Sequence, residues 1–208
     1  MIMKYGYKPS ILDGTEKIYS LKQNITIPEA YTYEPYMSPV INQGSNPTCV
    51  PCSISAHLNW NRNITAKTNK IDNGIDIKEI YNIRQDKRGD GMTIKEALHY
   101  LYKHGVKSNV GNMKIRKYAM IKSPLTLKQA LLMNGPCIAA LKVYNSGLEF
   151  WDKNNGEFLG GHCICIVGWN KEGFIIRNSW GSSWGNKGYT LISYDDFKYF
   201  LELWTIII

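Results

Sequence analysis

The sequence contains no uninterrupted apolar run long enough to span a bilayer, which takes about 20 residues in a helix. Its first residues lack the apolar core of a signal peptide, and no internal repeat or low-complexity tract follows. The five cysteines are an odd number, which excludes a fully paired disulfide framework. We therefore expect no membrane association, and we favour an intracellular, reducing compartment or a virion over secretion.

Signatures of nucleic-acid binding are also absent. Lys and Arg number 25 against 17 Asp and Glu, which gives a net charge of +8. The basic residues are scattered, and the densest groups, at 84–88 and 114–117, accompany no zinc-finger, RNA-recognition or helix-turn-helix pattern. We interpret the excess as a solvated basic surface and expect no nucleic-acid partner. A chain of 208 residues with 44% hydrophobic content suits one compact domain or two closely packed subdomains, and we expect a monomer.

Helical signals are concentrated in the first half of the chain and strand signals in the second half. Thr93 and Glu96 form a capping box that opens a helix, and we expect Thr126 to cap another helix that ends at Gly135. From residue 137 the apolar period changes to two, as expected of strands. This segregation predicts an α+β fold in which helices pack beside an antiparallel sheet, with a ligand cleft between the two halves. The expected helices are 49–61, 75–85, 93–105 and 126–135, and the expected strands are 137–144, 162–169, 174–177, 188–192 and 204–208.

Cys49 follows a turn-rich loop and lies at the start of a predicted helix. Asn46-Pro47 favours a turn and Thr48 is a good N-cap residue, so Cys49 falls at the first helical position. The backbone N–H groups and the positive end of a helix dipole favour thiolate over thiol. Taken alone, this cysteine is better explained by packing beside a turn, so the interpretation depends on a base and an oxyanion donor elsewhere in the chain.

A base and its orienting group are available far along the sequence. His162 follows Gly160-Gly161 and begins an apolar strand, and Asn178 follows the next strand across a hairpin turn at 170–173. We then expect residues 162 and 178 to lie near the same end of this hairpin, the end opposite its turn. There the Asn178 amide could hold one nitrogen of the His162 imidazole while the other nitrogen faces the Cys49 thiol. A Cys–His–Asn mechanism requires this arrangement, and Trp180 is placed to shield it from water.

Four motifs resemble those of the papain-like cysteine peptidases (the C1 family), in that family's order along the chain. They are similar to short microbial and viral members that lack a long propeptide, and the likeness covers about residues 34–208. The family implies a papain-like fold with a mainly helical subdomain, an antiparallel β subdomain and the active site in the cleft between them. The motifs are 37–44 ending in Gln43-Gly44, Thr48-Cys49, Gly160-Gly161-His162, and Asn178-Ser179-Trp180-Gly181.

The resemblance assigns a role to each matching residue. It implies that Cys49 is the nucleophile, His162 its acid/base partner and Asn178 the orienting residue. Gln43 is similar to the side-chain donor of the oxyanion hole, with the Cys49 N–H as second donor. Two weaker matches concern glycines that contact substrate: Gly91 is similar to the glycine that hydrogen-bonds substrate backbone, and Gly161 to the residue before the catalytic histidine.

The resemblance also suggests a division of the chain and implies a substrate class. We expect an extended N-terminal arm at 1–35, a mainly helical subdomain at 36–125 with the nucleophile helix, and a mainly β subdomain at 126–208 with His162 and Asn178. The implied activity is that of an endopeptidase that acts on a peptide or protein substrate, without metal or cofactor. Two alternatives share this fold: a catalytically silent binding protein, and a ligase that resolves the acyl-enzyme with an amine.

Two other readings of the cysteines carry less weight. Cys49-x-x-Cys52 has the form of a redox motif, but a thioredoxin-like setting needs a strand that leads into the motif, and the loop before Cys49 supplies none. A zinc site made of Cys49, Cys52, Cys163 and Cys165 would place half its ligands in an apolar strand. The family spacing of six positions from Gln43 selects Cys49 over Cys52 as the nucleophile.

Overall fold

The computed structural model describes residues 5–21, 23–65, 73–109 and 111–208. Within these ranges the chain forms helices packed on a seven-stranded sheet, and all pairings within that sheet are antiparallel. Met1 to Lys4, part of the stretch inspected for a signal peptide, lie outside the described residues. The sheet has the strand order β10-β9-β8-β7-β11-β6, and β2 pairs with β8 off this path.

The bounds of the elements follow the sequence prediction in the second half of the chain more closely than in the first. The α-helices are α1 (Cys49–Thr65), α2 (Ile77–Asn82), α3 (Ile94–Lys103) and α4 (Pro124–Asn134), and the short 3-10 helices are η1 (Glu34–Tyr36), η2 (Lys153–Asn155) and η3 (Asp195–Tyr199). The strands are β1 (Tyr7–Lys8), β2 (Tyr31–Thr32), β3 (Met92–Thr93), β4 (Val106–Ser108), β5 (Gly111–Met113), β6 (Lys117–Met120), β7 (Cys137–Val143), β8 (Gly160–Trp169), β9 (Gly173–Arg177), β10 (Tyr189–Ser193) and β11 (Glu202–Ile207).

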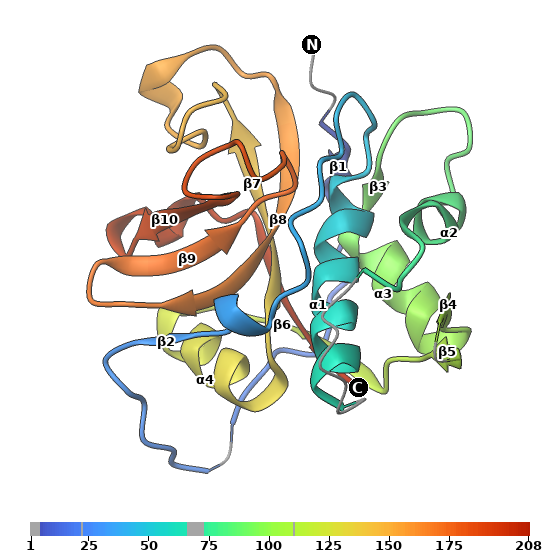
Figure 1. Cartoon of the computed structure of the whole chain (residues 1–208), viewed down its shortest axis with the longest axis horizontal. Helices are drawn as coiled ribbons and strands as arrows, with labels where there is room; N and C mark the ends of the chain where they lie inside the picture. The colour runs from blue at the N-terminus through green and yellow to red at the C-terminus, as the bar shows by residue number, and fades with distance from the viewer. Residues whose placement is uncertain (1–4, 22, 66–72, 110) are drawn as a thin grey trace.

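Apolar residues form two clusters, one against each face of the sheet. The first joins α1, α3 and one face of β7, β8 and β11, and it includes Cys163 and Cys165. The second joins α4 to the opposite face and includes Ile164 and Ile166. Alternation along β8 thus sends Cys163, Cys165 and Val167 toward α1 and Ile164 and Ile166 away from it. After the irregularity between Ile166 and Gly168, Trp169 joins the second cluster. Figure 1 shows α1 running between the sheet strands β7–β10 and the helices α2 and α3.

Two helix starts show how local chemistry sets the bounds. At α3 the Thr93 hydroxyl accepts from the Glu96 N–H, and the Glu96 carboxylate accepts from the Thr93 N–H, which confirms the predicted capping box. At α4 the predicted cap is wrong, because Ser123 is the N-cap and Thr126 occupies the third helical position. Pro124 at the first helical position explains the earlier start, since its missing N–H has no partner there in any case.

The N-terminal arm lies on the body as an extended segment, but the sequence did not predict where it runs. Its β1 pairs in parallel with β3, with Tyr7 opposite Met92. Farther along, the arm reaches the main sheet, where Tyr31 pairs with Trp169. In Figure 1 β1 runs beside β3. The arm therefore crosses the side of the molecule where α1 begins.

Candidate active site

Cys49 is the first residue of α1, as predicted. The first helical bond that follows it runs from the Cys52 N–H to the Thr48 carbonyl at 2.9 Å. The Thr48 hydroxyl lies 3.8 Å from the Cys52 sulfur, so Cys52 contacts the cap residue while Cys49 stands at the helix start. All five cysteines are buried, and their thiols are free.

His162 and Asn178 meet as the sequence predicts. The His162 Nε2 lies 2.7 Å from the Asn178 Oδ1, and both side chains are buried. Asn178 Oδ1 also accepts from the Ser179 N–H at 2.7 Å, which fixes the amide orientation. The second imidazole nitrogen, Nδ1, has no hydrogen-bond partner. This leaves one nitrogen held and the other open to a reacting group.

Aromatic rings surround the imidazole. Trp180 stacks on His162 with 4.8 Å between ring centroids, which confirms its predicted place over the His–Asn pair. Phe150 and Tyr5 approach edge-on at 5.8 and 6.3 Å. Sequence reasoning missed these last two residues, because neither belongs to a periodic pattern or to a quoted motif.

Gln43 is tied to the same loop as Asn178. Its backbone N–H donates to the Ser179 carbonyl at 2.8 Å, and its Oε1 accepts from the Ser179 hydroxyl at 2.6 Å. Its Nε2 donates to the Asn46 carbonyl at 3.0 Å, just ahead of the nucleophile helix. The structure thus brings Gln43 to the junction between the Cys49 loop and the Asn178 loop, and its oxyanion role stays a prediction.

Residues 6 and 7 of the chain itself fill the space in front of these groups. The Met92 N–H donates to the Gly6 carbonyl at 2.9 Å. A Cβ at Gly91 would lie 2.4 Å from the Gly6 oxygen, and one at Gly161 would lie 2.5 Å from the Tyr7 ring. Both glycines proposed to contact substrate therefore face the arm closely. Since Gly91 has φ +83°, a side chain there would also strain the backbone.

Burial determines whether the side chains of Cys49 and His162 are charged or neutral. Cys49 and His162 both have no exposed surface. Desolvation raises the pKa of the Cys49 thiol to about 11, although hydrogen bonding from the backbone of Cys163 and Gly6 opposes this. Desolvation lowers the pKa of His162 to about 4, against the opposing effect of its bond to Asn178. The helix start predicted a thiolate, but in this conformation burial outweighs it and both groups are neutral near pH 7.

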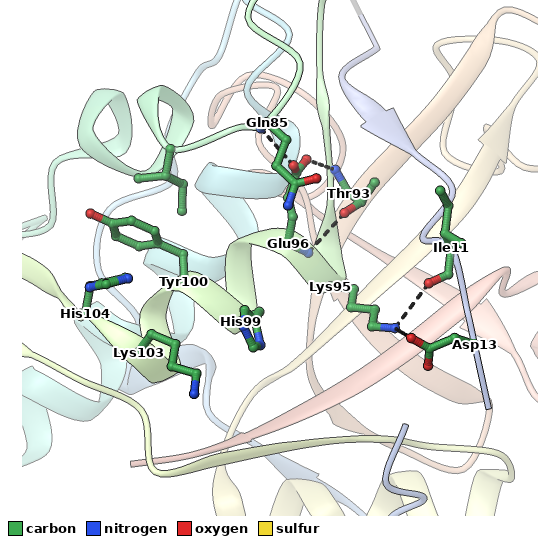
Figure 2. A pocket seen from close by; sticks show the side chains of 11 residues that line it. Ile11, Asp13, Gln85, Thr93, Lys95, Glu96, His99, Tyr100, Lys103 and His104 are labelled. Atoms are coloured by element: carbon green, nitrogen blue, oxygen red, sulfur yellow. Dashed lines mark hydrogen bonds and ion pairs between the residues drawn. The ribbon is translucent and has the colours of Figure 1, made fainter. Parts of the chain in front are cut away.

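A cavity of about 620 Å³ lies apart from these groups. Figure 2 shows it between the arm and α3, with Ile11 and Asp13 on one side and His99 and Lys103 on the other. Neither Cys49 nor His162 lines it. Among the described residues no cluster of His, Cys, Asp and Glu is arranged to hold a metal ion, and no described helix is long and apolar enough to cross a membrane.

Comparison with known proteins places this geometry in a family. The family model described as "Papain family cysteine protease" matches residues 65–200, more than half of the chain. The match includes His162 and Asn178 and begins after Cys49. The chain therefore belongs to the papain family of cysteine proteases.

Individual relatives support this membership over different lengths. The chain is 32% identical over 83 residues to a gut-specific cysteine proteinase of Caenorhabditis elegans, an alignment that covers 36% of this chain and 25% of that protein. It is 27% identical to an uncharacterized peptidase C1-like protein of Acanthamoeba polyphaga mimivirus, over 90% of this chain and 71% of the other. It is 26% identical to mouse cathepsin K, over 89% and 65%. The chain thus spans less than two thirds of the length of some relatives.

A solved structure shows the same fold. Xylellain, a cysteine protease from Xylella fastidiosa, has a TM-score of 0.82 over 99% of this chain and 96% of its own, at 21% identity. A procathepsin B of Trypanosoma congolense has a TM-score of 0.79 at 15% identity, over 98% and 85%. At these identities the likeness concerns the fold, and it confirms the papain-like α+β arrangement.

Proposed function

We propose that the chain is a cysteine endopeptidase in which Cys49 is the nucleophile, His162 the acid/base and Asn178 the orienting group. The observation that carries this proposal is the asymmetry of the imidazole: Nε2 is held by Asn178 at 2.7 Å and Nδ1 has no partner. The buried His57 also leaves one nitrogen without a partner, but its other nitrogen meets a backbone carbonyl, that of Pro136. His162 differs because its bonded nitrogen meets a side-chain amide and because the next residue, Cys163, hydrogen-bonds to Cys49 through its backbone.

The chemistry follows from these roles. The Cys49 thiol passes its proton to His162, and the sulfur attacks the carbonyl carbon of a peptide bond. The imidazolium gives the proton to the departing amine as the C–N bond breaks, which leaves an acyl-enzyme. His162 then takes a proton from water, the hydroxide attacks the thioester, and the acid leaves with the thiol restored.

When Cys49 attacks, negative charge develops on the oxygen of the substrate carbonyl, and hydrogen-bond donors near Cys49 are needed to stabilise it. The Cys49 N–H is at the start of α1, where the first backbone N–H groups have no intrahelical partner. Gln43 is held within the same loop system by its bonds to Ser179. These placements support the two as oxyanion donors, since a donor helps most when it is fixed before the reaction.

The N-terminal arm lies where a substrate would have to approach Cys49. A substrate backbone has to reach Cys49, and Gly6 and Tyr7 lie against the Gly91–Met92 edge beside it. The Met92 N–H donates to the Gly6 carbonyl there. We therefore propose that residues 5–8 move aside before turnover. Their departure readmits water and removes the desolvation that keeps the Cys49 thiol protonated.

The test compares Cys49→Ala with Cys52→Ala, each combined with Tyr7→Ala to loosen the arm. Hydrolysis of a mixed peptide substrate should fall at least a thousandfold in the Cys49 variant, because the nucleophile is lost, and stay within about threefold in the Cys52 variant. Unchanged melting temperatures serve as the control for folding. Full activity without Cys49 would sink the assignment, and formation of ligated peptides in place of hydrolysis products would favour the ligase alternative.

A further inference from the structure

Five cationic side chains surround a second cavity, of about 290 Å³, which we call the basic pocket. It adjoins the cavity of about 620 Å³ between the arm and α3, because Lys95, His99 and Lys103 line both. Among the described residues that line the basic pocket, Glu16 supplies the only carboxylate. The cationic residues are Lys17, Lys95, Lys103, Arg116 and Lys117.

Most of this positive charge has no carboxylate partner within the described part of the chain. Lys95 is neutralised, because it pairs with Glu16, whose side chain is 6% exposed, and lies near a second carboxylate of the arm. Lys17, Lys103 and Lys117 form no ion pair with another described residue. Like charges gathered around a cavity repel one another and raise the local concentration of anions. The charge of the basic pocket therefore favours an anionic ligand.

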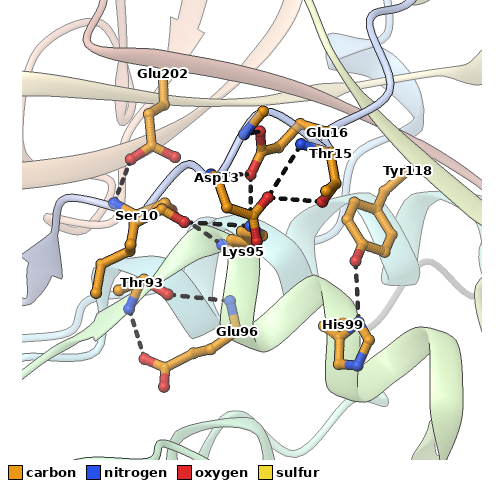
Figure 3. Close-up of polar contacts among 12 residues, drawn as sticks. Ser10, Asp13, Thr15, Glu16, Thr93, Lys95, Glu96, His99, Tyr118 and Glu202 are labelled. Atoms are coloured by element: carbon orange, nitrogen blue, oxygen red, sulfur yellow. Dashed lines mark hydrogen bonds and ion pairs between the residues drawn. The ribbon is translucent and has the colours of Figure 1, made fainter.

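The three lysines come from three separate parts of the fold, and their backbones are held in place. Lys103 ends α3 and Lys117 begins β6. The His99 Nδ1 lies 3.1 Å from the Tyr118 hydroxyl, which joins these two elements across the pocket (Figure 3). A backbone N–H of β6 donates to the Lys17 carbonyl at 2.8 Å, which holds this part of the arm beside them. The walls of the pocket are thus fixed before any ligand arrives, which lowers the cost of binding.

The size and charge of the two adjoining cavities indicate the class of anion. Several lysines around one point suit a phosphate group, which carries more than one negative charge and accepts hydrogen bonds on several oxygens. The larger cavity has a volume in the range of small-molecule sites and so has room for the rest of a ligand. It is less suited to the anionic group itself, because Asp13 and Glu96 line it.

We propose that the basic pocket binds the phosphate group of a small phosphorylated molecule, whose remainder lies in the adjoining cavity. The ammonium groups of Lys17, Lys103 and Lys117 surround the phosphate oxygens, and binding relieves their mutual repulsion. This site goes beyond the proposed peptidase function, because neither Cys49 nor His162 lines either cavity. Binding is therefore independent of whether the chain cleaves peptides.

Calorimetry on the unmodified chain, with inorganic pyrophosphate and ADP as probes, tests the site at about 0.15 M salt, where weak general attraction is screened. Both probes should bind with a Kd of about 100 µM or below. The Lys103→Ala, Lys117→Ala protein should bind each at least about tenfold more weakly, because two charge-assisted contacts are lost. Lys142→Ala, Lys171→Ala removes two exposed lysines elsewhere and is the matched control, with a Kd that should stay within about twofold. Equal melting temperatures show that both variants fold.

The two probes also separate the sources of the phosphate group, since they share a diphosphate and differ in the organic part. ADP should bind more tightly, and equal affinities would contradict a place for the remainder in the adjoining cavity and leave the inorganic ion as the ligand. Acetylation of lysines, mapped by mass spectrometry, locates the site: ADP should protect Lys103 and Lys117 and leave Lys142 and Lys171 unprotected. Absence of binding, equal losses in the two double variants, or equal protection of all four lysines would overturn the proposal.

Discussion

At the scale of single residues, the two reacting groups are held in neutral forms by burial. The pKa of Cys49 rises to about 11 and that of His162 falls to about 4, so the thiolate–imidazolium pair is disfavoured in the described conformation. A second histidine, His57, is also buried, with its Nδ1 2.6 Å from the Pro136 carbonyl and its pKa lowered to about 4. Burial therefore sets the electrostatics of the site, and the arm backbone at Gly6 opposes its effect on Cys49.

The lowered pKa values of His57 and His162 predict how the free energy of unfolding depends on pH. Both have pKa values of about 4 in the folded chain, below the ordinary value of 6.5. Between pH 6.5 and 4 the unfolded chain binds protons that the folded chain does not, so the free energy of unfolding falls as pH falls. The two histidines should contribute a slope of about 2.7 kcal/mol per pH unit, or two protons, near pH 5.

Denaturant unfolding at a series of pH values measures this slope. His162→Gln should lower it by about one proton, and His57→Gln by about one more. Cys52→Ala keeps both histidines and is the control, whose slope should match that of the unmodified chain. Equal slopes in the chain with and without His162 would contradict the buried, neutral state of that residue.

Spacing in the sequence was sufficient to predict the contact between His162 and Asn178. It was not sufficient to predict which aromatic residues surround them. Asn178 could be matched to His162 because a hairpin turn fixes where two neighbouring strands end. Tyr5 and Tyr7 could not be found in this way, because their places depend on tertiary contacts of a segment that has no period of its own. The raised pKa of Cys49 was missed for the same reason.

At the scale of elements, the strand that carries His162 and its neighbour β7 were predicted best. The predicted strand at 162–169 corresponds to β8, which begins two residues earlier, and 137–144 corresponds to β7, which ends one residue earlier. The short strands β4, β5 and β6 were missed, because three or four residues do not establish a period of two. The β6 strand lies in the predicted helical part of the chain but pairs with β11 in the main sheet.

The corrected start of α4 predicts which residue stabilises that helix. The Ser123 hydroxyl accepts from the Thr126 N–H at 3.2 Å, so Ser123→Ala should lower the free energy of unfolding by about 1 kcal/mol. Ser123→Asp keeps an acceptor at the cap and should cost little. Chemical denaturation of both variants measures the difference. Equal losses in the two variants would show that the hydroxyl contributes nothing as a cap.

At the scale of the whole molecule, the arm is held on α3 by a single residue, Lys95. Lys95 lies 3.4 Å from the Asp13 carboxylate and also pairs with Glu16. Its N–H donates to the Ser10 hydroxyl at 3.2 Å, and its ammonium donates to the Ile11 carbonyl at 3.2 Å. These bonds converge on one residue of α3, through its ammonium group and its backbone N–H (Figure 3). The ion pair with Lys95 also lowers the pKa of Glu16.

Weakening this attachment should expose the nucleophile. Lys95→Ala removes the charge that both carboxylates share, and we expect it to raise the rate of Cys49 modification by a thiol reagent about two- to fivefold. Added salt should have a smaller effect in the same direction on the unmodified chain and little effect on the variant, because salt screens the exposed Asp13 carboxylate more than the buried Glu16 carboxylate. Lys103→Ala, on the same helix, is the matched control. A Lys95→Ala rate equal to that of Lys103→Ala would contradict the fastening role.

The sequence indicated the α+β class from segregation of helical and strand patterns, and the resemblance indicated the papain-like arrangement. It did not indicate that the arm lies against the Gly91–Met92 edge, because β1 has two residues and its partner is 85 positions along the chain, with Tyr7 opposite Met92. Contacts between segments so distant leave no local pattern. The division into an arm and two subdomains at 35 and 125 stays a prediction.

The central claim is that Cys49, activated by His162, is the nucleophile of this chain. Labelling with a peptidyl epoxide, followed by peptide mapping of the modified cysteine, tests it most directly in the Tyr7→Ala protein. The account predicts modification at Cys49 alone among the five cysteines, lost when His162→Ala is added. Modification of Cys52 at a comparable rate, or labelling of Cys49 that persists unchanged without His162, would contradict it.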